Sequence, residues 1–183
     1  MKLVVELGMG DGRHLDELSK DDQDINALFI GIEKDTSLFA EAARRINASN
    51  VVLINDNFES RITDFENETI DKVIMILPDP KFVDRHYHDD WVSLYASIFL
   101  KLKKLGELEI ITEIIDELLQ PVSDAAFYTW AKWLLETFVR IGFGVAEILN
   151  GPPVNYASTC LDRFTQDPER IRLMTLRLFK PRD

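Results

Sequence analysis

Glycines and acidic side chains that could hold a small ligand lie together near the start of the chain, in the segment Glu6-Leu7-Gly8-Met9-Gly10-Asp11-Gly12. Glycines tolerate positive φ angles and let a ligand approach the backbone, so such a turn between a strand and a helix can cradle a cofactor. Glu33 follows roughly 20 residues later, the spacing at which a carboxylate accepts hydrogen bonds from both hydroxyls of an adenosine ribose. A plain strand-to-helix turn is the alternative for the glycines alone.

The acids beside the glycines indicate which cofactor is bound. Glu6 directly precedes the glycines, and Asp11 lies among them. Negative charge at these positions repels a pyrophosphate, whereas it attracts the ammonium and sulfonium groups of S-adenosylmethionine (SAM). We therefore expect SAM rather than a nicotinamide dinucleotide.

Asp56 and Asn57 follow the third apolar run, where the adenine of such a cofactor is expected. An acid or amide at this point can accept a hydrogen bond from the exocyclic amine of adenine. Aspartate and asparagine are also common N-caps of helices, so a purely structural role is the alternative. The two roles are compatible with each other.

Pro78 and Pro80 flank Asp79 at the end of the fourth apolar run, and they fix the direction of the chain there. A carboxylate at this position can stabilise positive charge that develops on a substrate. We predict that Asp79 points into the ligand site. It is the residue that we expect to act in catalysis.

His86 and His88 follow in a stretch rich in aspartate. Two imidazoles separated by one residue lie on one side of an extended segment and could bind a metal. The segment lacks the helical spacing of common metal-dependent hydrolases, so we predict no metal site and assign both histidines to substrate contact. Asp89 and Asp90 are expected at the N-cap and first turn of a helix that begins near Trp91.

Alternation of short apolar runs with helical spacing predicts the elements that position these residues. Strands are expected near residues 2–7, 27–32, 50–55, 70–77, 106–112, 144–149 and 171–180. Several runs are apolar on both faces, as strands covered by helices on both sides must be. We predict an α/β fold in one domain, residues 1–183: a doubly wound, Rossmann-like sheet of about seven strands, mostly parallel, with an antiparallel C-terminal hairpin at its edge. Ligands of such sheets bind beyond the carboxyl ends of the strands.

Composition limits the partners and the compartment. The 183 residues include 21 basic and 32 acidic residues, a net charge of -11, which repels a phosphate backbone unless the basic residues gather on one face. Two basic clusters are present, one at residues 101–104 and one in the last 21 residues. Cys160 is the only cysteine, and no apolar run is long enough to cross a bilayer. We expect a cytoplasmic protein that does not enter membranes.

The order of these motifs resembles that of the tRNA (guanine-N7-)-methyltransferase family. The resemblance is carried by the glycine turn with Arg13-His14, by Gly31-Ile32-Glu33, by Pro78-Asp79-Pro80 and by Arg85-His86. It extends to Thr112-Glu113, similar to a Thr-Asp pair of the family, and to residues 159–164, similar to its Thr-x-Phe-Glu-x-Arg signature. The resemblance implies a SAM-binding set and a substrate-binding set. The first is Glu6, Gly8, Gly10, Glu33, Asp56 and Asn57, and the second is Asp79, Arg85, His86, Thr112, Glu113, Thr159 and Asp162.

Three departures from the family pattern shape the functional hypothesis. The lysines and arginines that follow Pro-Asp-Pro-Trp in the family are replaced by an acidic stretch, and the basic N-terminal extension is missing. Leu161 and Asp162 stand in place of Phe and Glu. We expect a reduced methyltransferase for which tRNA binding calls for a homodimer or a partner chain. The alternatives are a methyltransferase of a small molecule or protein, and a non-catalytic SAM-binding regulatory or scaffolding subunit.

Overall fold

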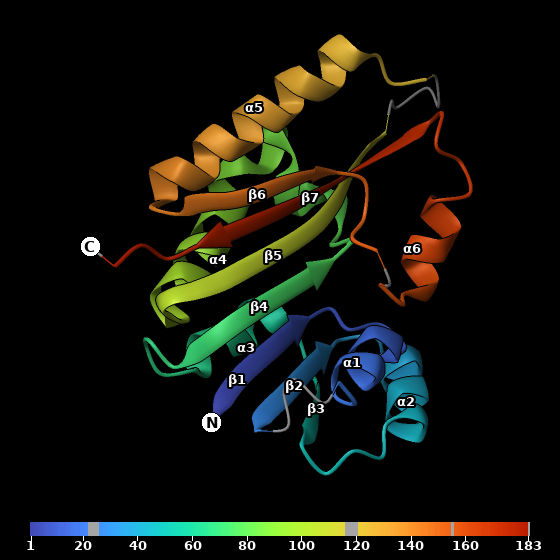
Figure 1. Cartoon of the computed structure of the whole chain (residues 1–183), viewed down its shortest axis with the longest axis vertical. Helices are drawn as coiled ribbons and strands as arrows, with labels where there is room; N and C mark the ends of the chain where they lie inside the picture. The colour runs from blue at the N-terminus through green and yellow to red at the C-terminus, as the bar shows by residue number, and fades with distance from the viewer. Residues whose placement is uncertain (22–25, 116–120, 155, 183) are drawn as a thin grey trace.

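The computed structural model describes residues 1–21, 26–115, 121–154 and 156–182, and their strands form one sheet (Figure 1). The strands are β1 (Lys2–Leu7), β2 (Ala27–Glu33), β3 (Val51–Asn55), β4 (Ile70–Ile76), β5 (Leu102–Ile115), β6 (Gly144–Asn150) and β7 (Ile171–Phe179). The helices are α1 (Arg13–Leu18), α2 (Thr36–Arg45), α3 (Phe58–Asp64), α4 (His88–Lys101), α5 (Asp124–Ile141) and α6 (Thr159–Phe164), with short 3-10 helices η2 (Pro80–Val83) and η3 (Arg85–Tyr87).

The strand order is β3-β2-β1-β4-β5-β7-β6. Strands β1 to β5 pair in parallel, whereas β7 runs antiparallel to both β5 and β6. This confirms the predicted fold class, the number of strands and the antiparallel hairpin at one edge. The chain leaves β1 toward β2 and β3 and then returns to place β4 on the other side of β1. The carboxyl ends of β1 and β4 therefore flank the crevice where ligands of such sheets bind.

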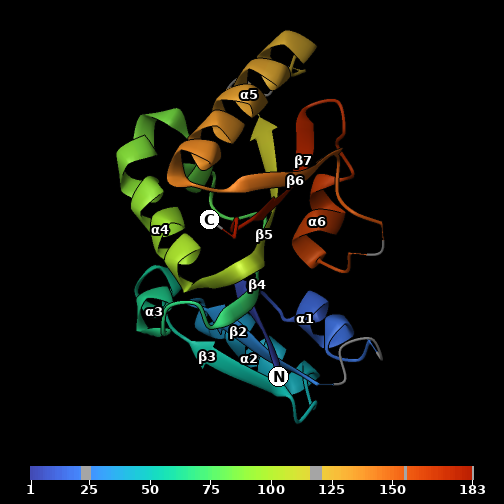
Figure 2. The ribbon, with the colours of Figure 1, turned by 60° about the vertical axis from the view of Figure 1, so that its left-hand side comes forward.

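Helices cover both faces of the sheet, as the apolar strands predict (Figures 1 and 2). One face packs against α3, α4 and α5 through a core that includes Ile62, Trp91 and Phe138. The other face packs against α1, α2 and α6 through a core that includes Leu15 and Leu161. No helix in the described ranges combines the length and apolar character that a membrane crossing requires.

Two elements differ from the sequence-based expectation. Strand β5 begins at Leu102, four residues before its predicted start, because the spacing of Leu102 also fits the apolar stripe of α4. The pairing of β4 with β5 shifts register between Ile70 and Lys72. Helix α6 lies in a stretch where the hydrophobic pattern of the sequence predicts no helix. It has six residues and only Leu161 is buried, too short a pattern for helical periodicity.

The start of α4 is also one turn earlier than predicted. The helix begins at His88, and Tyr87 rather than an aspartate occupies the N-cap position. Asp89 and Asp90 lie in the first turn, where their negative charge meets the positive end of the helix dipole. The prediction of acids in the first turn is confirmed, and the N-cap assignment is wrong.

Candidate functional site

The glycine turn after β1 has the backbone geometry that a bound ligand requires. Gly8, Gly10 and Gly12 have φ angles of 75°, 58° and 73°, which favour glycine. The N–H groups of Gly8 and Met9 donate to the carbonyl of Ile32, at 2.8 and 3.1 Å, and tie the turn to β2. A Cβ atom on Gly10 would meet nothing within 4 Å, so this glycine borders open space.

Gly12 has a different role in the turn. A Cβ atom on Gly12 would lie 2.8 Å from the Cβ of Ala42. Gly12 therefore lets α1 begin in close contact with α2. This packing requirement explains the third glycine of the turn, and no ligand is needed to explain it.

A cavity of about 320 Å³ lies between the glycine turn and α6. Its wall includes four of the predicted site residues: Glu6, Gly8, Gly10 and Thr159. Much of the remaining cavity surface is formed by His14, Leu38, Glu41, Ile76 and Arg163. The cavity lies at the carboxyl ends of β1 and β4, the edge at which the sequence predicts a ligand.

Glu6 forms a buried ion pair beneath this cavity. Its Oε2 atom lies 3.0 Å from Nδ1 of His14, and both residues are buried. Burial alone would lower the pKa of His14, but the charge of Glu6 and the hydrogen bond to it outweigh burial and hold this pKa above its ordinary value. The imidazole also stacks on the ring of Tyr156, with centroids 4.5 Å apart.

Glu33 ends β2 and is held by two backbone donors. Gly10 N–H donates to Oε2 at 3.0 Å, and Asp35 N–H donates to Oε1 at 2.8 Å. Each oxygen retains a second lone pair for another donor. The carboxylate thus joins the glycine turn to the start of α2, although it does not line the cavity itself.

Asp56 and Asn57 follow β3 as predicted, and their side chains serve the start of α3. Asn57 is the N-cap residue, and its side chain accepts a hydrogen bond from Glu59 N–H at 2.8 Å. Asp56 accepts from Asn57 N–H at 2.7 Å and forms an ion pair with Arg61 at 3.3 Å. The structural alternative considered for Asn57, an N-cap role, is therefore observed.

Asp79 is exposed at the end of β4, after a residue with unusual backbone geometry. Leu77 has a φ angle of 48°, a left-handed conformation that costs a non-glycine residue energy and is often found at functional sites. Asp79 Oδ1 accepts a hydrogen bond from Lys81 N–H at 3.0 Å and starts η2. Its second oxygen has no partner among the described residues.

Glu113 and Thr112 lie on neighbouring β5, and both are buried. Glu113 Oε2 and the Thr112 hydroxyl have no hydrogen-bond partner in the described part of the chain. Burial and the nearby negative charge of Asp79 raise the pKa of Glu113 to about 7. Asp79 and Glu113, predicted separately from the sequence, therefore lie close enough to interact.

Helix α6 contacts the glycine turn through two polar pairs. Thr159 donates to Asp11 Oδ2 at 2.9 Å, and Asp162 Oδ2 lies 2.6 Å from Nη1 of Arg13. Ser158 caps the helix by accepting from Leu161 N–H at 3.3 Å. Of the two α6 residues assigned to the substrate, Thr159 lines the cavity, whereas Asp162 is paired with Arg13 and is not among the lining residues.

Arg85 and His86 lie in a different place. Arg85 donates to the Thr129 carbonyl at 3.1 Å and lies over the ring of Trp133 at 5.0 Å, so α5 holds it. Both residues line a separate open cavity of about 580 Å³ with Arg140. The structure does not bring these two predicted substrate residues to the cavity beside the glycine turn.

The His86 and His88 rings each contact an adjacent acid instead of each other. Nδ1 of His86 lies 2.9 Å from Asp84 Oδ1, and Nδ1 of His88 lies 3.0 Å from Asp89 Oδ1. Over the ranges that the structure describes, no group of three or more histidine, cysteine or acidic side chains could hold a metal ion.

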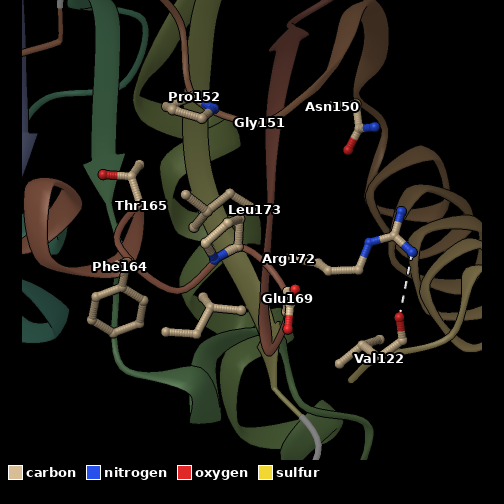
Figure 3. A pocket seen from close by; sticks show the side chains of 11 residues that line it. Val122, Asn150, Gly151, Pro152, Phe164, Thr165, Glu169, Arg172 and Leu173 are labelled. Atoms are coloured by element: carbon tan, nitrogen blue, oxygen red, sulfur yellow. Dashed lines mark hydrogen bonds between the residues drawn. The ribbon is translucent and has the colours of Figure 1, made fainter. Parts of the chain in front are cut away.

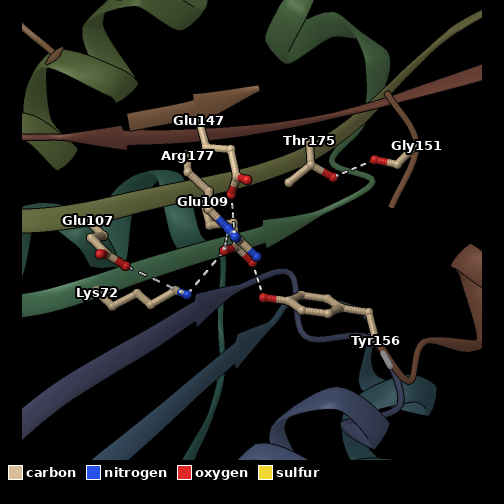
Figure 4. Close-up of polar contacts among 8 residues, drawn as sticks. All are labelled: Lys72, Glu107, Glu109, Glu147, Gly151, Tyr156, Thr175 and Arg177. Carbon is tan, nitrogen blue, oxygen red and sulfur yellow. Dashed lines mark hydrogen bonds and ion pairs between the residues drawn. The ribbon is translucent and has the colours of Figure 1, made fainter. Parts of the chain in front are cut away.

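A buried polar network beside the site was not predicted from the sequence (Figure 4). Glu109 on β5 is 1% exposed and accepts from Lys72 at 3.2 Å and from Arg177 at 2.8 Å. Tyr156 donates a further hydrogen bond to it. Burial alone would raise the pKa of Glu109, but Lys72, Tyr156 and Arg177 together lower it. The sequence contains one sign of this network, because charged residues stand at alternate positions of a predicted strand.

The basic clusters are mostly occupied by ion pairs. Arg177 and Lys180 are paired within the fold, with Glu109 and Glu68. In the lysine cluster Lys103 pairs with Asp71, near the amino end of β4 and so at the edge opposite the cavity. Arg163 lines the cavity and has no ion pair among the described residues.

Comparisons with known proteins agree with this geometry. A family model described as "Putative methyltransferase" matches residues 1–129. A tRNA (guanine-N(7)-)-methyltransferase of Chlorobium phaeobacteroides is 31% identical over 154 residues, which cover 82% of this chain and 69% of that protein. A second tRNA (guanine-N(7)-)-methyltransferase, from Mycoplasma genitalium, is 28% identical over 110 residues, which cover 55% of this chain and 51% of that protein. The chain thus spans between about half and two thirds of these relatives.

Solved structures share the fold at low sequence identity. The 16S rRNA methyltransferase KamB has a TM-score of 0.73 at 13% identity, with 99% of this chain and 88% of that chain covered. A SAM-dependent methyltransferase structure from Listeria monocytogenes has a TM-score of 0.70 at 16% identity, covering 98% and 90%. The chain therefore belongs to the SAM-dependent methyltransferase family whose curated members are named tRNA (guanine-N(7)-)-methyltransferases.

Proposed function

We propose that this protein transfers the methyl group of SAM to N7 of a guanine in tRNA. The observation that carries the proposal is the joint placement of the glycine-turn cavity and the Asp79–Glu113 pair at one edge of the sheet. Similarity to proteins named tRNA (guanine-N(7)-)-methyltransferases supports N7 of a tRNA guanine as the methyl acceptor. The proposal treats residues 1–183 as one domain, because a single sheet takes strands from both ends of the chain.

The residues around the turn fit the cofactor in shape and charge. Gly8 and Gly10 line the cavity, and the open space at Gly10 admits the methionine portion, while Glu6 attracts its ammonium group. The free lone pairs of Glu33 accept the ribose hydroxyls. Asp56 and Asn57 lie where the adenine is expected, and each keeps some acceptor capacity beyond the contacts that it makes at α3. When bound, SAM supplies an electrophilic methyl group on a sulfonium.

Methylation at guanine N7 needs little acid–base chemistry from the protein. N7 carries a lone pair in the plane of the ring and no proton, so positioning for in-line attack supplies much of the rate enhancement. The methylated ring is cationic, and a carboxylate beside it stabilises the developing charge. We assign this role to Asp79, whose free oxygen also accepts hydrogen bonds from N1–H and the N2 amine of guanine.

The remaining substrate residues fall into two groups. Thr112, Glu113, Thr159 and Asp162 lie at the edge that holds the cavity, and we assign them to contact with the guanine and its ribose. Arg85 and His86 line the separate cavity beside α5, so their proposed partner is the tRNA backbone farther from the target base. The guanine must leave its stack to reach the site, which requires a grip on that backbone.

A partner surface is part of the proposal. The net charge of -11 opposes tRNA binding, and most basic side chains already form ion pairs. We propose that a second copy or another chain adds basic surface. We also place the protein in the cytoplasm, where its single cysteine stays reduced.

The proposal is tested by incubating the protein with isotope-labelled SAM and tRNA that lacks the modification. Label recovered in the tRNA, and lost in Asp79→Ala, supports it. Label only in small molecules or proteins indicates the second function considered above, a different acceptor. SAM binding without transfer to any acceptor indicates a non-catalytic subunit.

A further inference from the structure

A second cavity, of about 480 Å³, lies next to the methylation site and has no assigned role (Figure 3). It is formed where β6 ends, β7 begins and α6 ends, so it opens at the same edge of the sheet as the cofactor cavity. Helix α6 borders both cavities. Thr159 and Arg163 line the first, whereas Phe164 and Thr165 line the second. A helix of six residues is about 9 Å long, so the two cavities are close neighbours.

The wall of the second cavity is suited to a flat, partly polar ring. Pro152, Phe164 and Leu173 supply apolar surface. Asn150 and Glu169 lie at the rim, and no hydrogen bond or ion pair in the described ranges uses either side chain. An amide and a carboxylate can accept hydrogen bonds from the N–H groups of a nucleobase. The aromatic ring of Phe164, across the cavity from Asn150 in Figure 3, offers a stacking surface for such a base.

Two arginines place positive charge near this cavity: Arg172 lines it, and Arg163 lines the neighbouring first cavity. Arg172 is held by Asp124 at 2.6 Å and by the Val122 carbonyl at 3.5 Å, so its guanidinium has a fixed position. Figure 3 shows it across the opening from Phe164. Arg163 lies between the two cavities and has no ion pair among the described residues. A free cation at this place suits a phosphate that joins two nucleotides.

We propose that this second cavity binds the base of the nucleotide next to the target guanine. The inference rests on the proposed function. The target base enters the cofactor cavity, Arg163 contacts the connecting phosphate, and the neighbouring base lies between Phe164 and the polar rim of Asn150 and Glu169. This arrangement holds the flipped-out strand at a second point. It partly compensates for the scarcity of basic side chains that are free of ion pairs.

The test combines the full chain with two substrates. One is unmodified tRNA, assayed for methyl transfer, and the other is a fluorescein-labelled single-stranded RNA of eight nucleotides with one guanosine, assayed by anisotropy. The variant Asn150→Ala/Glu169→Ala removes the polar rim without touching packed side chains. The control Glu66→Ala removes an exposed carboxylate at the opposite edge of the sheet.

The double variant is expected to bind the oligonucleotide about tenfold more weakly and to raise KM for tRNA by a similar factor. The value of kcat and the affinity for SAM stay within about twofold of wild type, and the control behaves as wild type. Phe164→Ala, tested beside it, weakens RNA binding roughly five- to tenfold through lost stacking.

The outcomes test the assignment of the second cavity separately from the proposed methylation reaction. If the oligonucleotide is bound through this rim but no 7-methylguanosine forms, the cavity assignment stands and the proposed reaction fails. If the double variant matches wild type in both RNA affinity and KM, the cavity assignment is wrong. It is equally wrong if wild type does not bind the oligonucleotide.

Discussion

Glu6 and His14 form a buried ion pair under the glycine turn, with 3.0 Å between Oε2 and Nδ1. His14 stacks on Tyr156, and Tyr156 donates to Glu109. A continuous set of polar side chains thus leads from the cofactor cavity to the interior of the sheet. It ties the chain just before α6 to the turn that we assign to SAM.

The Glu6–His14 pair makes stability depend on pH. Because the folded pKa of His14 is raised, its stabilising contribution is complete below its ordinary pKa of 6.5 and is lost as the pH rises through the folded value. We expect His14→Gln to lower the free energy of unfolding by about 2 to 4 kcal/mol at pH 6, and by less at pH 9. Urea unfolding at both pH values measures this. A loss that does not change with pH contradicts the charged pair.

Glu109 is expected to be a centre of stability. Glu109→Gln removes the buried partner that Lys72 and Arg177 share. They keep only the more exposed Glu107 and Glu147, and we expect a loss of about 2 to 4 kcal/mol at pH 7. The pKa of Glu109 is lowered, so its contribution is present above the ordinary carboxyl pKa and lost as the pH falls through the folded value. Denaturant titrations from pH 7 to pH 3 test this, with Glu107→Gln as the exposed control, where the loss is under about 0.5 kcal/mol. Equal losses in the two variants would refute the network.

Glu113 has the opposite dependence. Its pKa is raised to about 7 by burial and by Asp79, so the folded state is favoured below the ordinary carboxyl pKa and loses that advantage as the pH rises through 7. In Glu113→Gln the side chain stays uncharged across this pH range. We expect the variant to gain roughly 2 to 3 kcal/mol relative to wild type between pH 4.5 and pH 8. Thermal unfolding across this range checks the gain, and parallel curves for the two proteins rule it out.

Glu33 is expected to control cofactor affinity. Glu33→Gln retains one acceptor oxygen for a backbone N–H but loses the charge and the lone pairs that face the ribose. We expect a roughly 10- to 100-fold weaker Kd for SAM by calorimetry. Glu66→Gln, which changes an exposed carboxylate at the opposite edge of the sheet, is the control and changes Kd less than about threefold. Equal effects in the two variants would remove the ribose role from Glu33.

The sequence predicts the sheet well because hydrophobic periodicity directly reflects burial. Runs such as Val73–Leu77 are apolar on both faces, and the helices carry stripes three and four residues apart, so a doubly wound and mostly parallel sheet follows from general rules of α/β folds. The helix α6 could not be predicted in this way, because its contacts with the glycine turn depend on Arg13 and Asp162, which lie 149 residues apart.

The sequence predicts the candidate site less completely than it predicts the fold. Acids at strand ends indicate Glu6, Glu33 and Asp79 because the carboxyl ends of parallel strands meet at one edge. The position of Arg85 beside α5 depends on how η3 packs against Trp133, which no local pattern encodes. The network around Glu109 requires side chains from four separate segments of the chain.

The central claim is methyl transfer to guanine N7, and mass spectrometry of the product tests it most directly. Unmodified tRNA is incubated with SAM carrying a trideuterated methyl group, digested to nucleosides and analysed by liquid chromatography. Wild type and Glu66→Ala are expected to yield labelled 7-methylguanosine, and Asp79→Asn at least about 100-fold less, because the carboxylate charge beside the cationic ring is lost. Label in any other nucleoside, or none with wild type that binds SAM, would contradict the account.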